Sequence, residues 1–328
     1  MHKLLINILN YSIVKGSSDI HFVLQEKCRI SLRIHSEMVT YRSLPYDQGL
    51  RLLNYIRYFS RIDTNFKLKP QTGAFSLSFN NRKYSFRTSS LPTAKKDSIV
   101  IRILNNHTNI DLKSISRDNR INDFLTSVAA KRNGLFLICG PTGSGKSTSL
   151  YALLDHMNEN YTRNIITIED PIEVSKDYCL QIQLNESMGI NYQTTLKQIL
   201  RHDPDIIMIG EIRDSQTARL VVEASMTGHM VCSTLHSSNC LQAISRLRNL
   251  GIPEYDLVEI IKEICCQRIV FDENDNLILL SEFIDSKNIA SFFKNRSYDI
   301  YSFAKNIERL KDNGHISKRF QEQLNDEL

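Results

Sequence analysis

The sequence of 328 residues lacks the features that mark several specialised classes of protein. It has no tryptophan, no C-x-x-C pair among its seven cysteines, no repeat and no low-complexity segment. No apolar run approaches the roughly 20 residues that a membrane-spanning helix requires. Zinc is not expected, because structural zinc sites use closely spaced cysteine and histidine pairs. We expect the cysteines to be reduced, mostly buried thiols of a cytosolic protein.

The charge of the chain favours no single partner. Lysine and arginine total 41 and aspartate and glutamate total 36, which gives a formal net charge of +5. This mild excess suits an anionic partner such as a nucleotide, a membrane surface or a nucleic acid. No long basic block appears, however, and solvated surface lysines account for the excess equally well.

The pattern of apolar residues changes along the chain and predicts two domains. Residues 1–104 combine helical and alternating segments, which predicts a small α+β domain. The polar stretch 105–119 is expected to be a linker. Residues 120–250 alternate short apolar strands with helices, which predicts an α/β domain with a parallel sheet covered on both faces. Residues 251–328 are expected to form a mainly helical C-terminal subdomain.

The segment GPTGSGKS fits the phosphate-loop pattern G-x-x-x-x-G-K-[ST]. It follows an apolar strand and precedes a helix, which is the context that the pattern requires. Glycines let backbone N–H groups approach phosphate oxygens, and the N-terminus of the helix favours negative charge. Lys146 is expected to reach the β- and γ-phosphates, and Ser147 to ligate Mg²⁺. The predicted nucleotide-binding residues are Gly140, Pro141, Thr142, Gly143, Ser144, Gly145, Lys146, Ser147 and Thr148.

Two acidic segments follow apolar strands, at the edge where ligands bind to open parallel sheets. IITIEDPIE contains Glu169, which can hold the water shell of a metal ion or orient an attacking water, or can belong to a turn that caps a helix. DIIMIGE ends in Glu211, where a carboxylate can activate water for attack on a phosphate, or can be a surface charge. We predict Glu211, Lys146 and Glu169 as catalytic residues. Glu169 and Glu211 are also candidate Mg²⁺ ligands through water.

The segment TGHMVCSTLH places His229 and His236 at the two ends of one apolar strand. Near neutral pH a histidine can sense or contact a γ-phosphate, or relay between subunits. A lone histidine is more often structural, and the sequence leaves both interpretations open for this pair.

Taken in order, these four segments resemble the phosphate loop, Asp box, Walker B segment and His box of the secretion and pilus traffic ATPases of the GspE/PilB type. The resemblance continues in SRLRNLGI and CCQRI, and it covers the first domain in SSDIHF, QTGAFS, FRTSSLPT and IVIRIL. It implies a RecA-like P-loop NTPase domain preceded by a small PAS-like N-terminal domain.

The resemblance also implies that Arg87 and Arg102 of the first domain contact the nucleotide phosphates and take part in catalysis. A planar guanidinium bridges phosphate oxygens and offsets the charge that grows during phosphoryl transfer. The alternative is that both are ordinary strand arginines on a solvated face.

Ligands, partners and location follow from the same resemblance. We expect ATP and Mg²⁺ as ligands and no zinc, because the four-cysteine zinc insert of many export ATPases is missing. Family members form hexameric rings in the cytoplasm, at the inner face of the cell membrane. There they push on a polytopic membrane partner, which adds pilin-like subunits. The zinc-free form most resembles the competence ATPase of Gram-positive bacteria, which powers assembly of a pseudopilus for DNA uptake.

The sequence departs from the family pattern at two places. RIHSE stands where the family has R-x-D-G, so the turn at His35 and Ser36 is altered, and KKDS replaces the G-E that precedes IVIRIL. Whether the altered turn changes activity is left open by the sequence.

Three other functions stay open. Pilus-retraction ATPases share the four motifs and also lack zinc, although RLRNLGIPEYDL resembles the assembly branch. A RecA-type nucleic-acid motor would need basic loops with aromatic residues that stack on bases; here the basic residues are dispersed, and no direct nucleic-acid binding is expected. A nucleotide-dependent regulator would bind ATP with little turnover.

Overall fold

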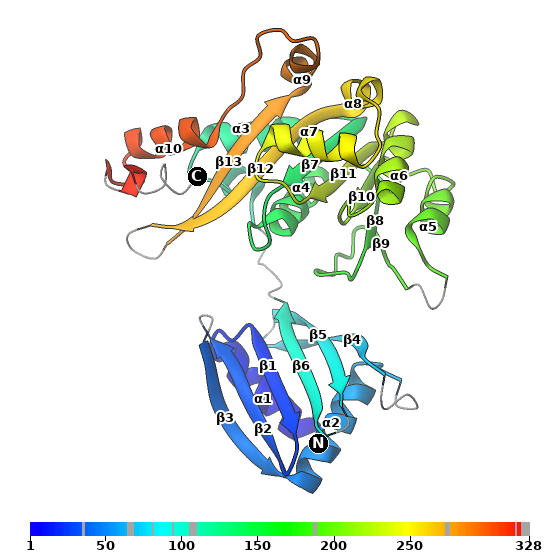
Figure 1. Cartoon of the computed structure of the whole chain (residues 1–328), viewed down its shortest axis with the longest axis vertical. Helices are drawn as coiled ribbons and strands as arrows, with labels where there is room; N and C mark the ends of the chain where they lie inside the picture. The colour runs from blue at the N-terminus through cyan, green and yellow to red at the C-terminus, as the bar shows by residue number, and fades with distance from the viewer. Residues whose placement is uncertain are drawn as a thin grey trace. The chain divides into compact units, whose positions relative to one another are not determined.

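A computed structural model of the chain describes residues 1–34, 37–63, 69–80, 82–93, 95–104, 110–185, 189–272, 276–318 and 320–322. The chain divides into two compact units, Met1–His107 and Thr108–Leu328 (Figure 1). The boundary falls close to the predicted end of the first domain at residue 104. The altered turn at His35 and Ser36 lies outside the described residues.

Unit 1 is an antiparallel sheet covered on one face by two helices (Figure 1). The six strands pair in the order β3-β2-β1-β6-β5-β4. The helices are α1 (His2–Val14) and α2 (Tyr46–Phe59). The strands are β1 (Asp19–Leu24), β2 (Lys27–Ile34), β3 (Glu37–Pro45), β4 (Gln71–Phe79), β5 (Arg82–Pro92) and β6 (Asp97–Leu104).

Side-chain spacing explains how unit 1 forms its core. Leu5, Ile8 and Leu9 of α1 are fully buried, and their spacing places them on one face of the helix. Successive side chains of a strand point to opposite faces, so Ile20 and Phe22 of β1 meet the helices while the residues between them face away. Unit 1 is thus an α+β unit whose sheet has one face packed against the two helices.

Unit 2 is a layer of strands between two layers of helices (Figure 1). Its seven strands pair in the order β13-β12-β7-β11-β10-β8-β9, and neighbouring strands are parallel except β12 and β13. The strands are β7 (Gly134–Cys139), β8 (Ile165–Glu169), β9 (Leu180–Gln183), β10 (Ile206–Ile209), β11 (Met230–Leu235), β12 (Ile261–Phe271) and β13 (Leu277–Asp285). The helices are α3 (Asn119–Ala129), α4 (Lys146–Asn160), α5 (Tyr192–Ile199), α6 (Ser215–Met226), α7 (Cys240–Asn249), α8 (Glu254–Ile260), α9 (Ser286–Phe293) and α10 (Phe303–Asp312).

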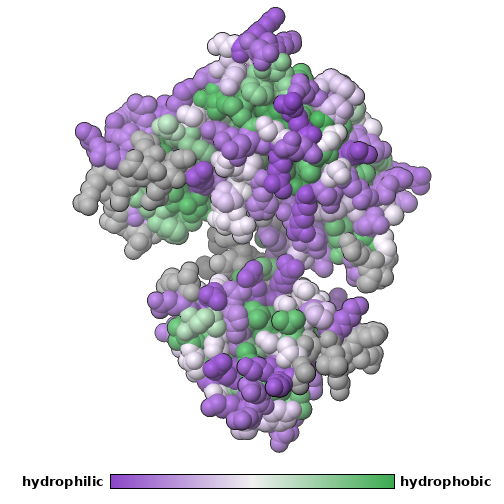
Figure 2. Space-filling view, viewed as in Figure 1, coloured by the Kyte–Doolittle hydropathy of each residue, from purple (hydrophilic) through white to green (hydrophobic). Residues whose placement is uncertain are grey.

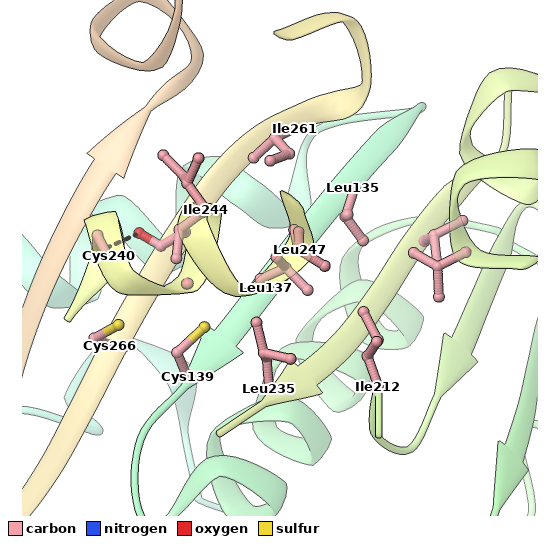
Figure 3. Packing of buried hydrophobic residues seen from close by; sticks show 14 of the residues in the cluster. Leu135, Leu137, Cys139, Ile212, Leu235, Cys240, Ile244, Leu247, Ile261 and Cys266 are labelled. Atoms are coloured by element: carbon pink, nitrogen blue, oxygen red, sulfur yellow. Dashed lines mark hydrogen bonds between the residues drawn. The ribbon is translucent and has the colours of Figure 1, made fainter. Parts of the chain in front are cut away.

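The central strand β7 contributes to two cores. Leu135, Leu137 and Cys139 pack toward α7 in the core shown in Figure 3, whereas Phe136 and Ile138 pack against α3 and α4 on the other face. A strand buried on both faces needs no polar alternation, which is why this segment is a continuous apolar run in the sequence. The face of the molecule shown in Figure 2 is mainly hydrophilic, with apolar side chains in separate patches.

The expectation of a mainly helical segment 251–328 is wrong for residues 261–285. Helix α8 ends at Ile260, and β12 and β13 then extend the sheet on the far side of β7. Periodicity alone does not distinguish a helix from a strand that is buried on both faces. The pairing of β12 with β7, two segments far apart in the sequence, decides the structure of IIKEICCQRIVF.

The end of the predicted linker 105–119 belongs to unit 2. Leu112–Ser114 forms a short 3-10 helix, and Leu112 is buried. Asp118 is fully buried and caps α3 by accepting a hydrogen bond from the backbone N of Arg120, at 3.0 Å. Within the described residues 110–119, part of the polar composition therefore serves capping and buried hydrogen bonds.

All seven cysteines are free thiols; six are buried, and Cys179 is partly buried. Figure 3 shows the sulfur of Cys139, at the end of β7, beside that of Cys266 on β12. Within the described part of the chain, no helix is both long and apolar enough to cross a membrane.

Gly49 marks the closest approach of α2 to the sheet of unit 1. A Cβ at this position would lie 2.2 Å from Cβ of Cys28 and 3.0 Å from Cδ1 of Leu24. We expect Gly49→Ala to lower the free energy of unfolding by about 1–3 kcal/mol, because helix and sheet must separate to admit the methyl group. Alanine is the better helix former, so packing and propensity act in opposite directions. Chemical denaturation measures the change.

The control for this substitution is Arg51→Ala, on the exposed side of the same helix. It should change the free energy of unfolding by less than about 0.5 kcal/mol. A Gly49→Ala protein as stable as the wild type would contradict the close packing of α2 on β2.

Candidate nucleotide-binding and catalytic site

The phosphate loop connects the carboxyl end of β7 to the first turn of α4. A Cβ at Gly140 would lie 2.4 Å from the carbonyl oxygen of Gln267, so only glycine fits between the loop and β12. Gly143 has a φ of 83°, and a Cβ there would meet nothing within 4 Å. The loop is therefore held tightly on the side of β12 and open at Gly143, as backbone amides that receive phosphate oxygens require.

Lys146 is turned back onto the phosphate loop. Its Nζ donates to the carbonyl oxygens of Gly140, at 2.9 Å, and Pro141, at 2.8 Å. Burial lowers the pKa of Lys146, and the carboxylate of Glu211 acts in the opposite direction. The ammonium group is thus held beside the loop by weak neutral acceptors that a phosphate oxygen can replace.

The remaining predicted binding residues differ in exposure. Ser144 is only 3% exposed, and its Oγ has no hydrogen-bond partner among the described residues. The exposed members are Pro141, Thr142 and Gly143, and the half-buried members are Gly145, Ser147 and Thr148. The accessible part of the loop is therefore its tip together with the first turn of α4.

Glu211 follows β10 and Gly210, and it lies in a cluster of charged side chains. It forms an ion pair with Arg213, which also reaches Asp170 at 3.3 Å. Oε2 of Glu211 lies 3.6 Å from Nε2 of His236. Burial lowers the pKa of His236, Lys146 lowers it further, and Glu211 raises it. At neutral pH the imidazole is therefore an uncharged neighbour of the carboxylate.

Parallel pairing brings these groups together. The carboxyl ends of β7, β11, β10 and β8 lie at one edge of the sheet, and each strand ends in a predicted residue or is followed closely by one. The charge of Glu211 raises the pKa of Lys146, and the charge of Lys146 lowers the pKa of His236. The phosphate loop, Glu211 and His236 thus form one site.

Glu169 also lies at this edge, but its carboxylate is buried and fully engaged. It is 3% exposed and accepts a short hydrogen bond from the hydroxyl of Tyr151 in α4. Thr167 Oγ1 donates at 2.7 Å and Gln181 Nε2 at 3.0 Å. Burial raises the pKa of Glu169, and the three donors oppose that rise. Glu169 therefore ties α4 and β9 to the end of β8.

His229 does not lie at the carboxyl edge of the sheet, where the phosphate loop is. It precedes β11, and its carbonyl oxygen accepts from the backbone N of Gly134 at the start of β7, at 3.0 Å. Its Nδ1 lies 2.9 Å from Oγ1 of Thr227. His229 and His236 thus occupy opposite edges of the parallel sheet, separated by the length of β11.

Arg87 and Arg102 belong to unit 1. They are direct partners across β5 and β6, so their exposed side chains share one face of the sheet. Arg102 Nε donates to Oδ1 of Asp19 on β1 at 2.8 Å. Burial would raise the pKa of Asp19, but hydrogen bonds from Arg102 and Ser18 lower it overall. The result is a pair of adjacent guanidinium groups, one of which is oriented by a carboxylate.

The oxygen atoms near the loop meet the requirements of Mg²⁺, which needs only one or two protein ligands besides water and phosphate. Ser147 lies in the first turn of α4, and the side chain of Glu211 is 23% exposed. The oxygens of Glu169, by contrast, already accept hydrogen bonds from three donors. Among the described residues no group of three or more His, Cys, Asp and Glu is arranged to hold a metal ion.

The sequence did not single out Tyr151, Gln181 and Arg213. Tyr151 lies inside an apolar helix segment, and no local pattern relates it to Glu169. Gln181 belongs to β9, a four-residue strand without a clear period. Only Arg213 could have been found from the sequence, because it stands two residues after Glu211 and carries the opposite charge.

Comparisons with known proteins agree with this geometry. The sequence matches the family "Type II/IV secretion system protein" over residues 1–300. It is 36% identical over 265 residues to competence protein ComGA of Bacillus subtilis, which covers 80% of this chain and 74% of that protein. It is 37% identical over 271 residues to the type II secretion system ATPase E of Vibrio cholerae, covering 82% of this chain and 54% of that protein. The chain therefore spans about half of the latter relative.

Solved structures share the fold. The ATPase DotB of Legionella pneumophila has a TM-score of 0.77 at 22% identity and covers 98% of this chain and 94% of its own. The pilus retraction motor PilT with bound ADP has a TM-score of 0.77 at 23% identity and covers 93% of this chain and 92% of its own. The α/β fold with a parallel sheet that the sequence predicts is confirmed.

The buried Tyr151–Glu169 pair makes a pH-dependent prediction. The pKa of Glu169 is raised in the folded protein, so its favourable contribution is present below the unfolded pKa and is lost as pH rises through the folded pKa. Tyr151→Phe removes a donor to the ionised carboxylate. We expect a loss of about 1.5–3 kcal/mol in the free energy of unfolding at about pH 8, and a smaller loss at about pH 5.

Chemical denaturation at the two pH values measures this difference. Tyr255→Phe is the matched control, because Tyr255 is 73% exposed and should show little change at either pH. Equal losses at both pH values for Tyr151→Phe would contradict a role for the hydroxyl in stabilising the charged form of Glu169.

Proposed function

The chain belongs to the Type II/IV secretion system protein family of P-loop ATPases, and we propose that it is the motor of a competence system. In this proposal, ATP hydrolysis drives assembly of a type IV pilus-like pseudopilus for DNA uptake. The observation that carries the enzymatic part is the meeting of the phosphate loop, Lys146 and Glu211 at one edge of a parallel sheet. The similarity to two competence proteins ComGA, at 36% and 37% identity, supports the finer assignment.

The proposed chemistry assigns a role to each group of the site. The loop amides and Lys146 bind the phosphates of ATP, and Mg²⁺, held by Ser147, would offset phosphate charge when bound. Glu211 orients the attacking water and accepts its proton, since its carboxylate is partly exposed at the site. His236, uncharged and 3.6 Å from Glu211, can sense the γ-phosphate through the same carboxylate.

Glu169 is proposed to be a positioning residue, which holds the helix that carries the phosphate-binding side chains. Its hydrogen bond from Tyr151 fixes α4, whose first turn carries Lys146 and Ser147. A carboxylate saturated by donors is better suited to holding a helix than to moving a proton. Water-mediated contact of Glu169 with Mg²⁺ is the alternative role, and it would require one of the three donors to leave.

Arg87 and Arg102 are proposed to contact the nucleotide phosphates in the working assembly. Their support is that both are exposed, adjacent and on one face of unit 1. Paired guanidinium groups of this kind suit a charge that grows during phosphoryl transfer. His229, at the opposite edge of the sheet from the loop, is proposed to act between subunits.

We further propose a hexameric ring in the cytoplasm, at the inner face of the membrane, that moves pilin-like subunits through a polytopic membrane protein. ATP and Mg²⁺ are its ligands, without zinc, and unit 1 is its PAS-like domain. Pilus retraction is the alternative of the same class. The similarity to PilT, at 23% identity, bears on the fold alone, whereas ComGA and type II secretion ATPases favour assembly.

The role of Glu211 is tested by Glu211→Gln. We expect the kcat of ATP hydrolysis to fall by about 10²–10⁴-fold, because the amide cannot accept the proton of the attacking water. Binding of ATP should persist. Phosphate release and equilibrium ATP binding are the two measurements. Glu159→Gln, at the exposed far end of α4, is the matched control and should leave both unchanged. Unaltered hydrolysis in Glu211→Gln would show that Glu211 is not the base that accepts the proton of water.

The biological assignment is tested in cells. Deletion of the coding sequence should abolish DNA uptake and pilin-like surface fibres, and the wild-type gene should restore both while Glu211→Gln should not. Retention of both traits after deletion would refute the competence assignment and leave the ATPase untouched. Strong stimulation of the purified enzyme by single-stranded DNA would instead favour a nucleic-acid motor.

A further inference from the structure

A row of buried polar residues crosses unit 2 from the phosphate-loop helix to the start of the unit. Four of its members lie on four different elements and the fifth precedes a helix, and each is at most 1% exposed. They are Ser149 of α4, Gln267 of β12, Ser281 of β13, Asn306 of α10 and Asp118, which precedes α3. Burying polar groups is unfavourable unless they are hydrogen-bonded, so the partners of these five residues matter.

Hydrogen bonds join the row at both ends. Gln267 Nε2 donates to Ser149 Oγ at 3.0 Å. At the other end, Asn306 Oδ1 accepts from the backbone N of Ser281 at 2.9 Å, and Asn306 Nδ2 donates to Asp118 Oδ2 at 2.9 Å. Asp118 also accepts from Arg309 Nε at 3.3 Å, so it anchors α10 to the beginning of α3.

Gln267 and Ser281 meet in the middle of the row. They are direct partners in the antiparallel pair β12–β13, so their side chains lie on the same face. Gln267 Oε1 and Ser281 Oγ are both buried and have no hydrogen-bond partner among the described residues. One is an acceptor and the other carries a rotatable donor. One buried water between them would give each atom a partner and join the two halves of the row.

The backbone of β12 supports the phosphate loop at the same place. The carbonyl oxygen of Gln267 would lie 2.4 Å from a Cβ at Gly140, and Ile269 Cδ1 would lie 3.1 Å from a Cβ at Gly145. The first and last glycines of the loop therefore rest on β12, while the side chain of Gln267 holds α4. A displacement of β12 would move both ends of the loop.

We propose that Gln267 is a positioning residue for the phosphate loop, and that the polar row through Ser281 and Asn306 couples the loop to Asp118, close to where unit 2 begins. This inference rests on the proposed function, because it concerns the binding of ATP at that loop. The side chain of Gln267 acts through Ser149, and its backbone carbonyl lies against Gly140. A displacement of Asp118 would in this way reach the phosphate loop.

The full chain is compared with Gln267→Met, Ser149→Ala and their combination. Ser225→Ala is the matched control: Ser225 is a buried serine of α6 whose hydroxyl donates to the carbonyl of Val221 at 2.8 Å, apart from the row. Asn306→Leu breaks the row at its far end without touching α4. The measurements are the Kd of a fluorescent ATP analogue, kcat and KM for ATP, and the melting temperature.

Gln267→Met and Ser149→Ala should each raise the Kd and KM by about three- to tenfold, with kcat within about twofold of the wild type. The double variant should match the stronger single variant, because both substitutions remove the same Gln267–Ser149 hydrogen bond. Asn306→Leu should raise the Kd by about two- to fivefold. Ser225→Ala should leave the Kd within about twofold of the wild type.

Several results would overturn the inference. A folded Gln267→Met protein with wild-type Kd, or one whose kcat falls at constant KM, would refute the role of Gln267, as would additive effects in the combination. If Gln267→Met does not fold, the Kd of Ser149→Ala is compared with that of Ser225→Ala, and equal values would refute the role of Gln267. A wild-type Kd in Asn306→Leu, or in Ser281→Ala if Asn306→Leu does not fold, would refute the coupling. A wild-type protein that binds no ATP would refute the proposed function too, whereas intact binding with unaffected variants refutes this inference alone.

Discussion

The parallel pairing of β7, β11, β10 and β8 is the constraint on which the site depends. Backbone hydrogen bonds set these strands in one register, so Cys139 is level with Leu235, and Ile209 is level with Ser233 and Ile168. The residues that follow each strand therefore emerge at one edge of the sheet. A strand that slipped by one residue would turn its side chains to the opposite face, and the two cores oppose such a slip because both faces are buried.

Two carboxylates at this edge differ because their surroundings differ. Glu211 is partly exposed, forms an ion pair with Arg213 and lies beside the uncharged imidazole of His236. Glu169 is buried and surrounded by donors from Tyr151, Thr167 and Gln181. The same side-chain chemistry thus supplies a group available to water in one case and a structural link in the other. Burial and donor count, rather than residue type, separate the two roles.

The β12–β13 hairpin makes the C-terminal part of the chain a component of the central sheet. Instead of a helical appendage, it extends the central sheet and forms the surface against which the phosphate loop rests. Its buried glutamine lies between the loop helix and a polar row that ends at Asp118. The edge of the sheet that carries the phosphate loop is therefore built by segments from nearly the whole length of unit 2.

Sequence pattern alone was enough to locate the strand and helix on either side of the phosphate loop and the apolar strand that precedes Glu211. The boundary it predicts at residue 104 lies close to the division after His107. These features are local: each depends on a short run of residues whose spacing or apolar character is visible without neighbours. The tertiary structure decided that 261–285 is a hairpin, that Asp118 is buried, that Glu169 is saturated by donors and that His229 faces the edge away from the loop. Each of those outcomes depends on contacts between segments distant in the sequence, where pairing and burial outweigh local pattern.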